Sequence, residues 1–432
     1  MFRKIFLLSL LIFSLSYAVD EIDIEKRRQK QQDFDNLIKS QDFSVPKNIG
    51  DNEQKNLILN VNSIDLEGNT IFEDFQIEAI LRRYVGKAKD IYALINELEN
   101  KYIEKGYVTT KVGLNTEKSD FENGNISLFV LEGKIDKVFY DGKENKFKTF
   151  ITFPQRENNI LNIRDLDQGI DNLGDNSKMD IKASDKNEYS NIYIKRDNKP
   201  ISFGINYNDL GQFDTSRHRI IYFLNTHNIF GLNESLDFSY QNKLQRQYKE
   251  RDTKNFSFGV SVPFKYWTFS YSYDSSEYLR TINVQNRKYR ATGKTKNQTF
   301  AIRKMLHRNE NHKIDIGAKI TLKDSKNYID DVRLVSSSRK LSVLTVDTTY
   351  TGRILSGLLS TNVGVSFGLE RFAANKDKEE WFRNEYTPKA QFRKYNVNIS
   401  WYKPIDKFYY KINVWRTIFK RYIVFARKNR NR

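Results

Sequence analysis

Cysteine is absent from the 432 residues of the chain, so the sequence has no disulfide framework, no thiolate nucleophile and no cysteine-ligated metal. Histidine is also scarce, and the four histidines do not follow the spacing of metal ligands. They are His218, His227, His307 and His312. We therefore expect no metal, no other cofactor and no enzymatic activity.

Long apolar runs are missing everywhere except at the start of the chain. Arg3 and Lys4 precede an apolar run from Ile5 to Leu15, and small residues follow at Ser16-Tyr17-Ala18. This pattern predicts a cleaved secretory signal peptide over residues 1–18. The alternative, a membrane anchor, is disfavoured because the run falls short of the ~20 residues that span a bilayer. The chain is thus expected in the periplasm, the outer membrane or the exterior.

Acidic residues are outnumbered, with 54 Asp and Glu against 72 Lys and Arg, giving a formal charge of +18. Such an excess suits either nucleic acid or an anionic membrane surface. The signal peptide argues against the first, so we expect no nucleic-acid partner. Proline is scarce at 6 residues, whereas Phe and Tyr number 30 and 25. So many aromatics favour neither a disordered chain nor a helical membrane protein.

The first half of the chain predicts a leader followed by two similar modules. Residues 19–43 are rich in charge with sparse apolar positions, which favours a solvated helix or, alternatively, a disordered leader. Residues 44–56, with Pro46 and Gly50, predict a linker. Residues 57–134 then predict the order β-α-α-β-β, and residues 135–199 repeat it more faintly. Asp90 is expected to cap the second helix of the first module and Gly106 to end it.

From residue 200 the periodicity changes to two. Segments of ~10 residues alternate apolar and polar side chains, as in Trp267-Thr268-Phe269-Ser270-Tyr271. This is typical of transmembrane β-strands, although a soluble sandwich alternates too. The signal peptide, the strand length and aromatics beside turns favour the membrane. The expected strands are 201–209, 217–225, 234–242, 254–263, 266–279, 298–306, 312–323, 340–351, 358–370, 390–403 and 407–414.

Six short motifs occur in an order that resembles the two-partner-secretion transporters of the haemolysin secretion/activation type. They are Ile64-Asp65-Leu66-Glu67-Gly68-Asn69-Thr70, Tyr102-Ile103-Glu104-Lys105-Gly106-Tyr107-Val108, Leu131-Glu132-Gly133-Lys134-Ile135, Asn162-Ile163-Arg164-Asp165-Leu166-Asp167-Gln168, Asn208-Asp209-Leu210-Gly211 and Asn228-Ile229-Phe230-Gly231-Leu232-Asn233-Glu234. The resemblance extends to about Val414.

The resemblance implies an α+β pair of periplasmic POTRA modules, POTRA 1 at 57–134 and POTRA 2 at 135–199, followed by an antiparallel transmembrane β-barrel at 200–414. It also implies that residues 19–43 form a helix in the barrel pore. The implied partners are a secreted exoprotein of the haemolysin, haemagglutinin or adhesin type, outer-membrane lipid and the barrel assembly machinery. The implied location is the outer membrane with the modules in the periplasm.

An exposed sheet edge could add a strand of the exported client by backbone hydrogen bonding. The alternation of Val108, Thr110 and Val112 predicts that this edge lies in a strand from Tyr107 to Leu114. The remaining motif residues are expected to be structural, in turns, caps and helix starts. They are Gly68, Asn69, Thr70, Gly106, Tyr107, Gly133, Arg164 and Asp165.

The end of the chain departs from the family pattern. Residues 415–432 contain no acidic residue and are expected to form an aberrant basic tail or, alternatively, a plain solvated one. About eleven of the family's sixteen strands are legible. We therefore expect an incomplete barrel in a truncated transporter that does not export alone.

The serious alternative function is an outer-membrane assembly factor, which shares the POTRA-barrel architecture. A second alternative, an outer-membrane lipase, would need a Ser/His/acid set.

Overall fold

The computed structural model describes residues 57–174, 177–196, 200–211, 214–215, 217–244, 250–284, 287–377, 389–405 and 408–419. The expected signal peptide, pore helix and linker at residues 1–56 lie outside this part of the chain. The chain divides into two compact units, residues 43–198 and the barrel unit that begins at residue 199. Among the described residues, no helix is long and apolar enough to cross a membrane.

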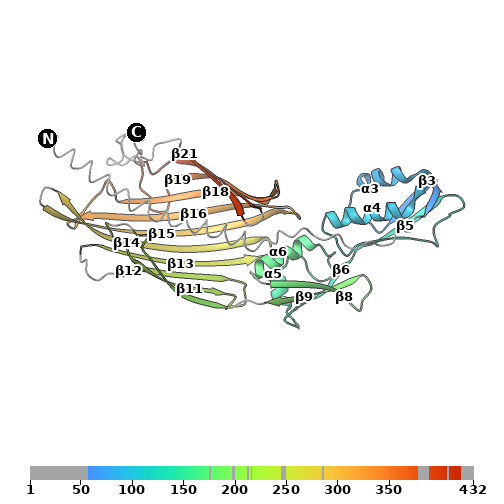
Figure 1. The fold of residues 1–432 in the computed structure, drawn as a ribbon, viewed down its shortest axis with the longest axis horizontal. Coiled ribbons are helices and arrows are strands. Elements are labelled where there is room, and N and C mark those ends of the chain that lie inside the picture. Colours follow the sequence, from blue (N-terminus) through green and yellow to red (C-terminus); the bar gives the residue numbers. More distant parts are fainter. Residues whose placement is uncertain are drawn as a thin grey trace. The chain divides into compact units, whose positions relative to one another are not determined.

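The first module contains five strands and two α-helices (Figure 1). These are β1 (Ile58–Val61), β2 (Ser63–Glu67), α3 (Asp74–Leu81), the 3-10 helix η1 (Arg82–Tyr84), β3 (Gly86–Asp90), α4 (Ile91–Glu104), β4 (Lys111–Leu114) and β5 (Asn125–Leu131). The single strand expected over residues 57–66 is in fact two, because β1 pairs with β3 while β2 pairs with β5. The central sheet has the order β2-β5-β4.

Helix α4 forms as the sequence predicts. The Asp90 carboxylate accepts hydrogen bonds from the backbone N–H groups of Tyr92 and Ala93, at 3.0 and 3.3 Å. This satisfies donors that the first turn of a helix leaves free. The face that packs against the sheet is fully buried and consists of Ile91, Leu94, Ile95, Leu98 and Tyr102.

The second module repeats the topology of the first. It consists of β6 (Lys134–Tyr140), β7 (Lys143–Glu144), α5 (Lys146–Thr152), α6 (Ile163–Leu173), β8 (Ser177–Ala183) and β9 (Tyr189–Arg196). The order β6-β9-β8, with β6 parallel to β9, matches β2-β5-β4, with β2 parallel to β5. The predicted repeat is therefore confirmed. Helix α5 is the first of the two helices that the repeat implies; its signal in the sequence is the cap Asn145, whose side chain accepts a hydrogen bond from Lys148 N–H.

The barrel unit is a single antiparallel sheet (Figure 1). Eleven strands follow one another along it, and the two-residue β17 (Val332–Arg333) pairs with the side of one of them. The eleven are β10 (Ile201–Asn208), β11 (Arg219–His227), β12 (Ser235–Lys243), β13 (Asp252–Phe264), β14 (Trp267–Val284), β15 (Arg287–Arg308), β16 (His312–Ile329), β18 (Arg339–Ile354), β19 (Gly357–Leu369), β20 (Arg393–Ile405) and β21 (Phe408–Phe419). Each matches one predicted strand.

Four predicted boundaries of the barrel strands are wrong by five residues or more: β14 ends at Val284 rather than 279, β16 ends at Ile329 rather than 323, and β15 and β21 are also longer than predicted. Strand β15 begins at Arg287 rather than near residue 298, because its added part is polar on both faces and shows no alternation of hydropathy. It is held by cross-strand contacts such as that of Lys294 with Glu277. Strand β21 continues to Phe419, pairing with β20 throughout, so residues 415–419 are not part of a tail. Residues 420–432 lie outside the described part of the chain.

We predict that residues 57–196 fold without the barrel, because each module buries its own apolar core. In this fragment, Leu98→Ala should lower the free energy of unfolding by about 2–5 kcal/mol, since Leu98 is fully buried. The exposed Glu104→Ala on the same helix should change it by about 0.5 kcal/mol or less. Urea unfolding followed by circular dichroism measures both values. A gradual melt without a near-UV signal would contradict independent folding.

Candidate functional site

The expected client-binding strand of the first module is shorter than predicted. Strand β4 lies at an edge of its sheet but begins at Lys111, so Val108 and Thr110 fall in the preceding turn. The backbone N–H of Thr110 is used within that turn, where it donates to the carbonyl oxygen of Tyr107 at 3.2 Å. Thr110 is almost fully buried, whereas Val108 is exposed. Of the three residues, only Val112 belongs to the edge strand.

The edge formed by β4 is also partly covered. Asn115 N–H donates to Ser127 in the neighbouring segment at 2.8 Å, so by alternation Val112 and Leu114 direct their N–H groups away from β5. The outward N–H of Val112 already donates to the carboxylate of Glu99 on α4 at 3.1 Å. An added strand would have to displace this carboxylate.

The second module offers a longer edge in β8. Ser184 N–H donates to the carbonyl of Tyr189 at 2.9 Å, which sets the alternation along β8. Met179, Ile181 and Ala183 consequently direct their N–H groups away from β9. Among the described residues, no side chain accepts a hydrogen bond from these three groups. Strand β8 thus presents these three outward N–H groups along seven residues, whereas β4 has only four residues.

The first motif folds into a turn that is fixed to the end of β5. Asn69 Oδ1 accepts hydrogen bonds from the Tyr102 hydroxyl at 2.7 Å and from Phe72 N–H at 3.0 Å. Thr70 N–H donates to the buried carboxylate of Glu132 at 2.7 Å. Burial, with Glu132 nearby, raises the pKa of the Tyr102 hydroxyl, which therefore remains a donor. Gly68 has φ +85°, and a Cβ there would lie 2.5 Å from the Val130 carbonyl oxygen.

Residues of three further motifs meet at the joint between the modules. Asn162 caps α6 with its Oδ1, and its Nδ2 donates to the Lys105 carbonyl at the end of α4, at 3.1 Å. Ile163 N–H donates to the Gly106 carbonyl at 2.8 Å. Leu161 N–H donates to the Gly133 carbonyl at 2.8 Å. The sequence placed these motifs at separate positions along the chain and did not indicate that they touch.

Both glycines of the joint are required by close packing. Gly106 has φ +98°, and a Cβ on it would lie 2.4 Å from Asn162 Oδ1. A Cβ on Gly133 would lie 2.3 Å from the Thr109 hydroxyl oxygen. A side chain at Gly106 would press on the Asn162 cap of α6, whereas one at Gly133 would press on Thr109 in the turn that follows α4. The backbone contacts between the modules therefore depend on glycine.

The other motif residues have local roles. Arg164 forms an ion pair with Asp167 one helical turn later, at 3.7 Å, and Asp165 lies in the first turn of α6, where its charge favours the helix dipole. The ring of Tyr107 packs edge-to-face against Tyr102, with 6.4 Å between centroids. These contacts lie within the modules, and a structural role for these residues stays a prediction.

A lysine inside the second module was not anticipated. Lys148 on α5 is 6% exposed, and its ammonium lies 4.9 Å from the centre of the Tyr140 ring. Burial, assisted by the nearby Arg196, lowers the pKa of Lys148 to about 8, while Asp141 opposes the change. Burial also raises the pKa of Tyr140 to about 12. A lysine so close to neutrality makes the stability of this module depend on pH.

The polar face of the barrel sheet carries a network across four strands. Arg303 of β15 pairs with Asp347 of β18 at 2.7 Å and crosses β16 at Gly317, where a Cβ would lie 2.8 Å from the guanidinium. Asn362 of β19 donates to the same carboxylate at 2.9 Å. Because outer-membrane barrels direct their polar side chains inward, this network lines the barrel interior.

One sequence match to a serine-hydrolase motif does not form a catalytic site. Gly364-Val365-Ser366-Phe367-Gly368 has the Gly-x-Ser-x-Gly pattern but lies within β19. The motif requires a sharp strand-to-helix turn that exposes the serine. Ser366 is instead 2% exposed, and its hydroxyl lies 2.9 Å from that of Thr345.

The fold and its motifs define a class: two POTRA modules followed by an outer-membrane β-barrel sheet. The model of the POTRA domain of ShlB type matches residues 59–133, and a further POTRA model matches residues 134–182. The model described as haemolysin secretion/activation protein ShlB/FhaC/HecB matches residues 188–420, more than half of the chain. The chain belongs to this family, and it resides in the outer membrane with its POTRA modules in the periplasm.

Among curated relatives, the outer membrane transporter CdiB of Escherichia coli is 26% identical over 362 residues, which cover 80% of this chain and 59% of the relative. The hemolysin transporter HpmB of Proteus mirabilis is 23% identical over 368 residues, covering 84% and 63%. The chain thus spans about three-fifths of the length of these relatives.

Two solved structures share the fold. CdiB from Escherichia coli aligns with a TM-score of 0.82 and 24% identity, covering 92% of this chain and 76% of that one. CdiB from Acinetobacter baumannii aligns with a TM-score of 0.71 and 16% identity, covering 95% and 78%. At this identity the likeness establishes the arrangement of POTRA modules and barrel strands.

Lys148 should make the stability of the fragment 57–196 rise with pH between about 8 and 9.5. In the unfolded chain the lysine keeps its proton to about pH 10.4, so between pH 8 and 9.5 the unfolded state binds more protons than the folded state. The free energy of unfolding therefore increases as the pH rises through this window. The expected gain is about 1–2 kcal/mol, since one group contributes at most about 1.4 kcal/mol per pH unit. Chemical unfolding at several pH values measures it.

The matched variant for this measurement is Lys148→Met, which keeps the length of the side chain without the charge. It should abolish the rise. The raised pKa of Tyr140 acts in the opposite direction only above about pH 10, outside the window. An unchanged pH slope in the methionine variant would show that another group titrates.

A side chain at the joint should weaken the module contact. Gly106→Ala combines a positive φ with a clash against Asn162, so we expect a loss of about 1–3 kcal/mol in the fragment 57–196. Gly142→Ala provides the control, because Gly142 also has a positive φ (+84°) but no atom within 4 Å of the added Cβ. Equal losses in the two variants would mean that backbone strain alone, and not the joint, is responsible.

Proposed function

We propose that this protein recognises a secreted partner protein in the periplasm through its POTRA modules and that its barrel strands form part of the path by which that partner crosses the outer membrane. The observation that carries the proposal is the combination of open sheet edges in the modules with a barrel sheet lined by polar side chains on one face. The similarity to the outer membrane transporter CdiB and the hemolysin transporter HpmB supports it.

The open edges suit a client that arrives unfolded. Backbone hydrogen bonds do not depend on side-chain identity, so an edge can bind many extended sequences. The polar face of the barrel, exemplified by Arg303, Asp347 and Asn362, would then keep the moving chain hydrated. No GxxxxGK[ST] phosphate loop occurs in the sequence, which fits a process that draws on folding of the client outside the cell rather than on a nucleotide.

We propose that the client pairs with β8 rather than with the Val108–Val112 segment. The N–H groups of Thr110 and Val112 already have acceptors in Tyr107 and Glu99. The outward N–H groups of β8 lack a protein acceptor among the described residues, so pairing there displaces water but breaks no hydrogen bond within the protein. Binding at a group that has no partner within the protein is more favourable than binding that must first break a hydrogen bond within the protein.

Replacing Ala183 with proline tests this edge. The Ala183 side chain is exposed and its N–H faces outward, so proline should be tolerated while it removes one donor. We expect binding of the client's secretion domain to the fragment 57–196 to weaken by about 5–10-fold, the value of about one hydrogen bond. Titration calorimetry measures the affinity.

The control is Ala183→Ser, which retains the N–H and should bind normally. Leu114→Pro tests the β4 edge in the same way, since its N–H also faces outward. If Leu114→Pro weakens binding and Ala183→Pro does not, the client pairs with the first module. Export itself is tested by expressing the chain in a strain that lacks its own transporter and measuring secreted client; secretion would contradict the expectation from the sequence that this chain does not export alone.

A further inference from the structure

The barrel sheet has an apolar face that must meet the membrane. Along β14, Trp267, Phe269, Tyr271 and Tyr273 lie on one face, and Thr268, Ser270, Ser272 and Asp274 lie on the other. Apolar side chains of outer-membrane barrels face lipid. The first set therefore lies on the lipid side, together with its cross-strand neighbours Phe300 and Ile302 on β15.

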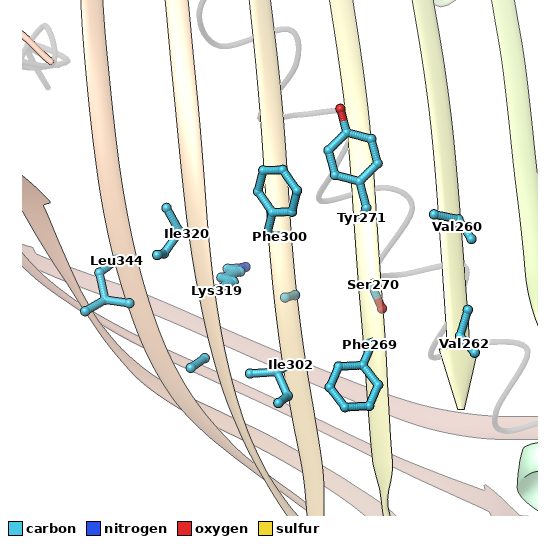
Figure 2. A pocket seen from close by; sticks show the side chains of 12 residues that line it. Val260, Val262, Phe269, Ser270, Tyr271, Phe300, Ile302, Lys319, Ile320 and Leu344 are labelled. Atoms are coloured by element: carbon cyan, nitrogen blue, oxygen red, sulfur yellow. The ribbon is translucent and has the colours of Figure 1, made fainter. Parts of the chain in front are cut away.

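This lipid-facing surface is hollowed over five neighbouring strands, β13 to β16 and β18. The hollow has a volume of about 520 Å³ (Figure 2). Figure 2 shows the rings of Phe269, Tyr271 and Phe300 with the branched side chains of Ile302 and Ile320 around it. The other apolar side chains of the lining are Val260, Val262, Ala318 and Leu344.

A small residue explains the hollow. Ala318 on β16 faces Ile302 on one side and Val346 on the other, so a methyl group stands between two branched side chains. A larger apolar side chain at position 318 would keep the surface apolar and would fill this gap. Its size and its lining suit a flexible hydrocarbon chain that lies against the strands.

One end of the hollow carries a positive charge. Lys304 lies two residues beyond Ile302 on the same face of β15, about 7 Å along the strand. Its ammonium is 5.0 Å from the centre of the Trp267 ring, which faces it across the strands. Among the described residues Lys304 has no carboxylate partner. A cation held over an indole at the edge of an apolar surface is suited to the headgroup level of a bilayer.

The position of Lys304 identifies the leaflet. The strands at this end are joined by short turns, such as Leu355-Ser356, in which both residues have positive φ. Short turns of outer-membrane barrels face the periplasm. Lys304 therefore lies at the periplasmic leaflet, which consists of phospholipid, and not at the outer leaflet with its lipopolysaccharide.

We propose that this surface is a binding site for an anionic phospholipid of the periplasmic leaflet. The phosphate is held by Lys304 beside Trp267, and one acyl chain fills the hollow over Ala318.

The test uses the full chain, extracted from outer membranes in detergent, with phosphatidylglycerol and phosphatidylethanolamine as probes. Native mass spectrometry measures the fraction of protein that retains each lipid. Lys304→Gln should lower the affinity for phosphatidylglycerol about fivefold, the usual contribution of one lysine near an anionic surface. Ala318→Leu should reduce binding of both lipids by filling the hollow.

Lys296→Gln is the matched control, because Lys296 lies on the same face of the same strand, is exposed, and is eight residues from Lys304, near the opposite membrane surface. It should bind as the unmodified chain does. Each variant is first checked for heat-modifiable migration, which reports a folded barrel sheet. Equal retention of phosphatidylglycerol by Lys304→Gln and Lys296→Gln, or preference for neither lipid in the unmodified chain, would overturn the proposal.

Discussion

Backbone hydrogen bonding is the constraint on which the rest of the structure depends. Within a bilayer no water replaces an unmade bond, so a spanning strand needs a neighbour on each side. Every strand between β10 and β21 on the path of the barrel sheet has two. Once the strands are paired, the alternation of side chains follows, with the Trp267-to-Tyr273 set on one face and Ser270 and Asp274 on the other.

The same constraint has the opposite consequence in the periplasmic modules. Water can solvate the outward N–H groups of Met179, Ile181 and Ala183, so an unpaired edge is stable there and remains available to another chain. The first module closes part of its own edge, because Glu99 accepts from Val112. Two modules with one topology therefore present different edges, since Glu99 accepts from Val112 in the first and the edge strand has four residues there against seven in β8.

Close approach of backbones is the second recurring requirement. Gly106 and Gly133 allow the end of α4 and the end of β5 to contact the segment that leads into α6, and Gly317 allows Arg303 to reach Asp347 across an intervening strand. In each case a side chain would occupy the space that the contact needs. The joint of the modules and the charged network of the barrel thus both depend on residues that contribute no side chain of their own.

The sequence by itself determined the order of modules and strands, because period two and the 3.6-residue helical period are properties of neighbouring residues. It located the buried face of α4 and all eleven long barrel strands. Tertiary structure decided the rest. The polar half of β15 carries no hydropathy signal, the acceptors of Thr110 and Val112 come from a turn and a helix, and Gly106 meets Asn162 across 56 residues of chain. Such contacts depend on how the elements pack in space, which local periodicity does not encode.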